Sequence, residues 1–237
     1  MTRRRFYYTI IVRVAAAMLG LASLGISAQG RANYITPNPG LPPQGGALPP
    51  GYFGQSPVTY DLSGGGTVEL FNVVHAGFTN IVVTTVGADE FETFDSVLTG
   101  QASVNGGPLS AFGLTGSVEV EAFGKAGQTE GTFNTQMLSL NMAGTIGGDS
   151  VAIMLNPLIA STGVTTITNI GGTPPLFNIS SFFDVFTELS VNSGPFVASD
   201  GGHRVVLGSI PEPGSWIMLG LAGLIVPVCA RWGRRRA

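Results

Sequence analysis

The stretch from residue 117 to residue 123, SVEVEAF, decides the fold class that the sequence predicts. Val118, Val120 and Ala122 fall on one side of an extended chain. The serine and the two glutamates between them fall on the other side. Successive side chains of a β-strand point to opposite faces, so this period of two predicts a strand with one buried face.

The same alternation, or a run of β-branched residues, recurs along the middle of the chain. These runs lie at 67–74, 81–86, 137–142, 151–155, 164–170, 182–191 and 204–207. Glycine-rich turns such as GGG, NGGP and DGG separate them. About eight to ten short strands without a convincing helix predict an all-β domain. A β-sandwich is the preferred architecture, and a β-barrel is the alternative.

Charged residues are segregated along the chain. Residues 32–210 contain two basic and thirteen acidic residues, a net charge of −11, although the whole chain has a net charge of only −3. An acidic body would repel a phosphate backbone, which argues against nucleic-acid binding. The only cysteine, Cys229, lies in a terminal apolar run, so the body has no thiol for a disulfide or a metal site.

The N-terminal part has the composition of an export signal. A basic start (MTRRRFYYTIIVR) precedes an apolar run (VAAAMLGLASLGI) and then small residues (SAQGRA). This order is typical of a secretory signal peptide, which we place at 1–30, with a retained membrane anchor as the alternative. Residues 31–57 are rich in proline and glycine and are interpreted as a linker; a disordered arm or a loop-rich start to the domain are the other interpretations.

The C-terminal part combines an apolar run with arginines. Fifteen residues from Trp216 to Ala230 carry no charge. As a helix they would span about 22 Å, which is short of the ~30 Å hydrocarbon core of a membrane. The arginines that follow favour the cytoplasmic side. The sequence therefore predicts a short transmembrane helix that is a marginal anchor.

Residues 211–237 resemble the PEP-CTERM sorting signal, in which a Pro-Glu-Pro tripeptide precedes an apolar helix and an arginine cluster. The resemblance implies processing near the tripeptide by an exosortase, a membrane-embedded protease, and release to the cell surface or matrix of a Gram-negative bacterium that makes exopolysaccharide. It assigns the sorting motif to Pro211, Glu212 and Pro213, the membrane anchor to Trp216, Leu219, Leu221, Leu224, Ile225 and Val226, and the stop-transfer cluster to Arg231, Arg234, Arg235 and Arg236.

The body between residues 58 and 210 offers few candidates for chemistry. An acidic cluster at Asp89, Glu90, Glu92 and Asp95 has oxygen ligands that calcium could use, but its spacing is not that of an EF-hand and a solvated strand edge is the favoured interpretation. A histidine, His75 or His203, could act as a general base, the second with Asp200 nearby in sequence. Glu119 and Glu121 could form a carboxylate pair for glycoside cleavage, although outward glutamates usually serve solubility.

We therefore expect an exported surface or extracellular-matrix protein without enzymatic activity, cofactor or metal. Its expected partners are the secretion machinery, signal peptidase, an exosortase and exopolysaccharide, but not nucleic acid. The expected course is export, transient anchoring in the inner membrane and then display at the cell surface or release. The alternatives are an exported carbohydrate-active enzyme and a permanently anchored single-pass protein.

Overall fold

A computed structural model describes residues 33–210 of the chain, and the regular structure in this range consists of β-strands. The strands are β1 (Tyr34–Thr36), β2 (Pro50–Gly54), β3 (Val58–Asp61), β4 (Thr67–Val86), β5 (Asp89–Val104), β6 (Ser110–Ala122), β7 (Gly131–Ile146), β8 (Asp149–Leu155), β9 (Ser161–Gly171), β10 (Leu176–Val185), β11 (Thr187–Val191), β12 (Val197–Ala198) and β13 (His203–Ser209). The predicted all-β class is confirmed.

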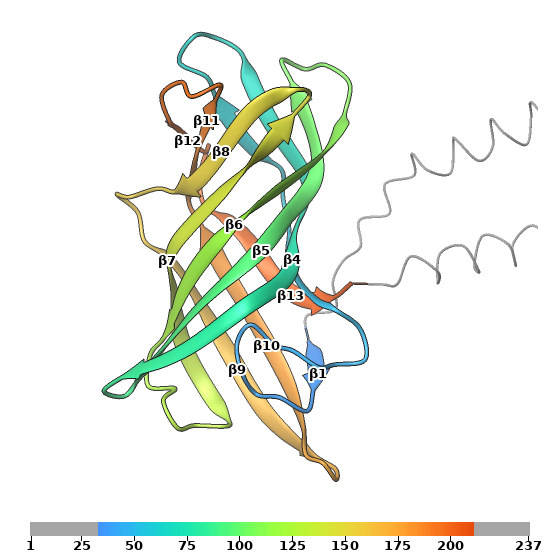
Figure 1. Cartoon of the computed structure of the whole chain (residues 1–237), viewed down its shortest axis with the longest axis vertical. Helices are drawn as coiled ribbons and strands as arrows, with labels where there is room; N and C mark the ends of the chain where they lie inside the picture. Colours follow the sequence, from blue (N-terminus) through green and yellow to red (C-terminus); the bar gives the residue numbers. More distant parts are fainter. Residues whose placement is uncertain (1–32, 211–237) are drawn as a thin grey trace, which may run out of the picture.

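The strands form one antiparallel sheet that closes into a barrel, which Figure 1 shows from the side. Eight strands make up the closed ring. The closed ring runs β2-β4-β5-β6-β7-β9-β10-β13 and returns to β2. In the other half of the barrel, β3 continues β2 along β4, and β8 takes the place of β9 along β7. There, β11 and β12 extend the sheet from β8. A bridge from Tyr60 on β3 to Ser199, directly after β12, closes this half of the barrel.

The preferred sandwich is therefore wrong, and the alternative of a barrel is correct. The two architectures share the same alternation within each strand, so the alternation does not distinguish them. The deciding contact is the pairing of β13 with β2, in which Leu207 lies opposite Tyr52. This pairing joins the two ends of the sheet and removes its open edges at that point.

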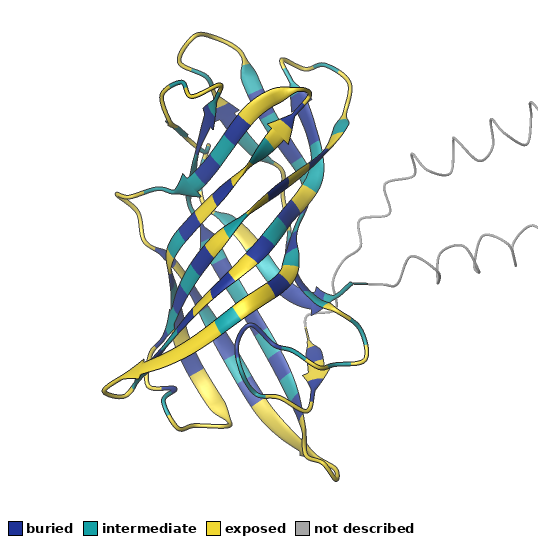
Figure 2. Ribbon diagram, viewed as in Figure 1, coloured by how far each residue is buried: buried dark blue, intermediate teal, exposed yellow. Residues whose placement is uncertain are grey.

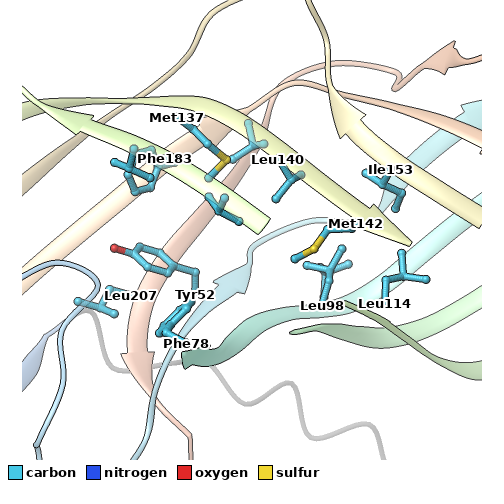
Figure 3. Close-up of a cluster of buried hydrophobic side chains, with 14 of the residues drawn as sticks. Tyr52, Phe78, Leu98, Leu114, Met137, Leu140, Met142, Ile153, Phe183 and Leu207 are labelled. Carbon is cyan, nitrogen blue, oxygen red and sulfur yellow. The ribbon is translucent and has the colours of Figure 1, made fainter. Parts of the chain in front are cut away.

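Side chains fill the barrel interior. Buried and exposed residues alternate along β5, β6 and β7 in Figure 2, as strands with one inward face require. Figure 3 shows the resulting cluster, in which residues such as Leu114, Met142 and Leu207 are fully buried. The Tyr52 hydroxyl donates a hydrogen bond of 3.1 Å to Ser181, so this ring reaches across the interior without leaving its polar group unpaired.

Two glycines allow strands to approach closely. A Cβ atom on Gly116 would lie 1.7 Å from the carbonyl oxygen of Asn141, and one on Gly163 would lie 2.0 Å from that of Phe182. No side chain fits at either position, because the neighbouring backbone occupies the space. Such glycines mark sites where a strand bends or another backbone approaches closely in a curved sheet.

The described part of the proline- and glycine-rich segment packs against the barrel. β1 pairs with β10, where Tyr34 lies opposite Ile179, and the Tyr34 hydroxyl donates to the carbonyl of Leu48 at 2.8 Å. Tyr34 and Leu41 are buried in the core. Residues 33–57 thus contribute two strands and part of the core to the barrel domain.

The predictions for the two ends fall outside the described residues. These are the signal helix at 1–30 and the sorting motif, anchor and arginine cluster at 211–237. Over residues 33–210, no helix has the length and apolar character that a membrane crossing requires.

Candidate functional site on the outer wall of the barrel

The interior of the barrel has little free space. Two interior cavities, both lined in part by His75 and Met137, have volumes of about 70 Å³ and about 20 Å³. Pockets for small molecules usually measure roughly 300–1,000 Å³. These cavities are therefore too small for a typical ligand.

A group of ionisable side chains is sealed inside the barrel near the smaller cavity. Lys125 forms an ion pair with Glu90, and only 4% of the lysine side chain and 12% of the glutamate side chain are exposed. Glu92 lies beside them with both carboxylate oxygens buried and without a hydrogen-bond partner. Burial, and then the neighbouring Glu90, raise the pKa of Glu92, while the charge of Lys125 opposes the rise.

His75 is buried in the same interior. Its Nε2 atom lies 2.6 Å from the Ser96 hydroxyl, and its ring packs edge-on against Phe78. Burial lowers the pKa of His75 to about 4. The ring is therefore neutral at pH 7 and serves the packing of the core.

A groove of about 620 Å³ lies on the outer wall of the barrel. It occupies a gap in the ladder between β2, β3 and β4, where the pairing passes from Phe53 opposite Val74 to Val58 opposite Leu70. In this gap β4 bulges, and Asn72 has a left-handed φ of 51°. The lining carries no formal charge. It includes the aromatic residues Phe53, Phe71 and Phe112 and the polar residues Gln55, Ser56, Asn72, Thr99 and Gln101.

A chain of three polar side chains begins at this groove with Ser56, the member of the three that lines it, whereas His203 lines the interior cavity of about 70 Å³. Ser56 Oγ is 3.3 Å from His203 Nδ1, and His203 Nε2 is 2.7 Å from Asp200 Oδ1. An ionised carboxylate can only accept, so Nε2 carries a proton, and in the tautomer with one ring proton Nδ1 is the acceptor. The Ser56 hydroxyl therefore donates to His203. This is the order of donors and acceptors found in a serine–histidine–aspartate triad, with the two ring nitrogens exchanged: here Nδ1 faces the serine and Nε2 the carboxylate.

The carboxylate of Asp200 is held in place from two sides. The backbone N–H of Thr59 donates to Oδ1 at 3.1 Å, and the backbone N–H of Asp200 donates to the Thr59 carbonyl at 2.9 Å. Partial burial acts to raise the pKa of Asp200, but the donors on Thr59 and His203 outweigh it and hold the pKa below its ordinary value. Asp200 therefore stays ionised and faces the imidazole.

The backbone also fixes Ser56 relative to His203. The N–H of Gln55, which precedes Ser56, donates to the carbonyl of Arg204, which follows His203, at 2.9 Å. His203 begins β13 directly after Gly202, where a Cβ atom would lie 2.6 Å from the Phe186 ring. The imidazole is thus held on a sheet strand, and only 12% of its side chain is exposed.

The four acidic candidates on β5 are divided between the two faces of the strand. On β5, Glu90 and Glu92 point inward, whereas Asp95 is exposed and accepts a hydrogen bond from Asn80 at 2.7 Å. Asp89 accepts from the Gly124 N–H. Within residues 33–210, no group of three or more acidic, histidine or cysteine side chains could hold a metal ion.

The outward glutamates remain on the surface. Glu119 and Glu121 alternate with the buried Val118 and Val120 on β6, and neither lines the groove or the interior cavities. They lie on the outer face, as the alternation predicts.

Sequence reasoning linked Asp200 with His203 but missed Ser56. The serine lies 147 residues from the histidine in the chain, so no local spacing could connect them. The buried pair of Lys125 and Glu90 was also missed. A lone lysine in an acidic body was the only signal, and it did not indicate burial.

Comparisons with known proteins identify no relative. No family model matches the chain, and no curated protein or solved structure matches it significantly.

Proposed function

We propose that this chain is an exported protein that an exosortase-type protease processes and that is then displayed at the cell surface or in the extracellular matrix. The observation that carries the proposal is the order of segments around the acidic body. A basic, apolar and small-residue stretch precedes it, and Pro-Glu-Pro, an apolar run and arginines follow it. These are the features of a signal peptide and of a short, stop-anchored helix.

The geometry of the described ends is compatible with this processing. Tyr34 and Ile210 lie close together, because they bond to the adjacent carbonyls of Leu48 and Pro49, respectively. The proposed recognition element, Pro211 to Pro213, begins immediately after a strand that is held in the barrel. Two prolines favour an extended chain, which suits a protease cleft.

The proposed role of the barrel is structural, in association with exopolysaccharide. Its interior is filled, and its net charge favours neutral or basic partners over anionic ones. The alternative of a permanently anchored protein predicts the same barrel with residues 211–237 still attached. The alternative of a carbohydrate-active enzyme that uses Glu119 and Glu121 would need a cleft at their outward face.

The sorting proposal can be tested by expressing the full chain in an exosortase-positive bacterium and in an otherwise identical exosortase-deficient strain. We expect loss of both terminal segments and appearance at the surface or in the medium only in the first strain, measured by intact mass. Replacing Pro211, Glu212 and Pro213 by alanine should retain the tail, whereas Ser215→Ala should not. Recovery of the wild-type chain in the cytosol with both ends intact would refute the proposal.

The matrix role has a separate test. The processed protein is incubated with the exopolysaccharide of its host strain and sedimented with it. Co-sedimentation that resists washing is expected, and its absence would remove the matrix part of the proposal without affecting the sorting part.

A further inference from the structure

We propose that Ser56, His203 and Asp200 form an acyl-transfer site that cleaves uncharged carboxylic esters bound in the outer-wall groove. The inference goes beyond the proposed function, because surface display requires no chemistry. It does not depend on export or processing, since the three residues all lie in the barrel. It differs from the expectation of a body without enzymatic activity.

Each residue has a defined role in this proposal. Ser56 is the nucleophile, because its hydroxyl donates to His203 Nδ1 and its residue lines the open groove. His203 is the general base, because its other nitrogen is engaged by a carboxylate and its free lone pair faces the serine. Asp200 is a positioning residue that holds the tautomer and stabilises the imidazolium that forms. The 3.3 Å separation of Ser56 and His203 is within the range seen before substrate tightens such a contact.

The site is preorganised by backbone bonds rather than by flexible loops. Thr59 donates a backbone hydrogen bond to the Asp200 carboxylate and accepts one from the Asp200 N–H. Gln55, next to Ser56, donates to the carbonyl of Arg204 on β13. His203 lies on strand β13, whereas Ser56 and Asp200 lie in bends between strands, and these backbone bonds hold the two bends close to the productive geometry.

We assign the donors for the developing oxyanion to amide side chains that line the same groove as Ser56. Pro57 follows Ser56 and has no N–H, so the backbone donor next to the nucleophile is missing. Asn72 and Gln101 line the same groove, and Asn72 Nδ2 donates to Gln101 Oε1 at 3.3 Å. This leaves one N–H of Asn72 and both N–H groups of Gln101 available. Amide side chains can stabilise such an oxyanion, typically by roughly 10²–10³-fold in rate.

The proposed reaction passes through an acyl-serine intermediate. Ser56 Oγ bonds to the ester carbonyl carbon while its proton passes to His203 Nδ1, and the carbonyl oxygen takes the electron pair. Collapse of this adduct breaks the bond to the alcohol oxygen, which leaves with the proton from Nδ1. Water then attacks the acyl-serine by the same route, which releases the carboxylic acid and restores Ser56.

The groove favours an uncharged substrate. None of its lining residues carries a formal charge, while the body around it is acidic. An anionic ester would be repelled by that body, and a cation would find no counter-charge in the groove. The phenylalanines of the lining suit an apolar part of the ester. The amide side chains suit a part that carries hydroxyl or carbonyl groups.

The test uses the purified full-length chain, an uncharged alkyl fluorophosphonate and p-nitrophenyl acetate. We expect covalent labelling of one serine, located at Ser56 by peptide mass, together with ester hydrolysis. Ser56→Ala should abolish both, and His203→Gln should slow both by at least about 100-fold. Ser96 is the internal control: it also bonds to a histidine, but it is buried and should not be labelled.

Two further variants distinguish a loss of catalysis from a loss of folding. In a Cys229→Ser background, Ser56→Cys should react with iodoacetamide faster than Ser117→Cys, because only the first thiol lies beside an imidazole. Asp200→Asn should lower kcat and leave KM unchanged, a separation that a purely structural role would not produce. An unlabelled wild-type chain, labelling that persists in Ser56→Ala, or equal reactivity of the two thiols would each overturn the proposal.

Discussion

The two histidines of this chain each contact a serine and line the same small interior cavity, but their partners differ. Inside the barrel, His75 Nε2 lies 2.6 Å from Ser96, surrounded by Phe78 and Phe94, with no space for a ligand. At the barrel wall, His203 joins an ionised Asp200 to Ser56, and Ser56 lines the open groove. The comparison teaches that a serine–histidine contact becomes reactive only in suitable surroundings. The histidine needs a carboxylate partner, and the serine needs a surface that a substrate can reach.

The largest expected effect concerns the sealed interior. Lys125→Met removes the only positive charge beside Glu90 and Glu92 and leaves two carboxylates in a buried site. We expect the free energy of unfolding to fall by about 3–5 kcal/mol, measured by urea denaturation at pH 7. Adding Glu90→Gln to this variant should recover part of the loss. A change below ~1 kcal/mol would show that water reaches the ion pair of Lys125 and Glu90. The interior would then not differ from the solvent-exposed groove in its access to water.

The interior histidine should also destabilise the fold on acidification. The pKa of His75 is about 4 in the folded state and 6.5 in the unfolded chain, so the unfolded chain binds the additional proton between these values. Stability is therefore fully present above pH 6.5 and is lost as pH falls toward 4. The expected loss from this residue is about 3 kcal/mol. It is measured as the pH dependence of unfolding of the wild type minus that of His75→Gln, and parallel curves would contradict it.

Glu92 should act in the opposite direction. Its raised pKa means that the folded state binds a proton more tightly than the unfolded state, so stability from this group increases as pH falls through the raised value. Glu92→Gln should therefore be more stable than the wild type at pH 7, with the difference shrinking in acid. Thermal unfolding of both proteins at pH 7 and pH 4.5 measures this. A variant that is less stable at pH 7 would refute the buried-charge interpretation.

The smallest effect on stability is expected at the wall site. Ser56 is exposed, so Ser56→Ala should change the free energy of unfolding by no more than about 0.5 kcal/mol while abolishing fluorophosphonate labelling. The matched change in the interior, Ser96→Ala, leaves His75 without its partner and should cost about 1–3 kcal/mol. Equal effects of the two substitutions on stability would remove the distinction between the two serine–histidine pairs.

Local patterns in the sequence predicted the all-β class, although the runs at 67–74 and 81–86 form the single strand β4 and the run at 182–191 is divided between β10 and β11. The alternation of SVEVEAF appears as inward Val118 and Val120 on β6, and the outward position of Glu119 follows from the same period. The alternation could not place the carboxylates of β5, because Glu90 and Glu92 occupy inward positions that polar residues rarely take without a partner. Their partner, Lys125, lies beyond the next strand, and no local pattern connects that lysine to β5.

The amino-acid order alone determined that residues 58–210 would form half-buried strands, since side-chain polarity with a period of two depends only on neighbours in the chain. It also determined where the charges and the apolar terminal runs lie. Tertiary structure decided that the sheet closes into a barrel, because closure depends on the pairing of β13 with β2. The same closure brings Ser56 to His203 across 147 residues, a meeting that long-range backbone pairing creates and that no local propensity encodes.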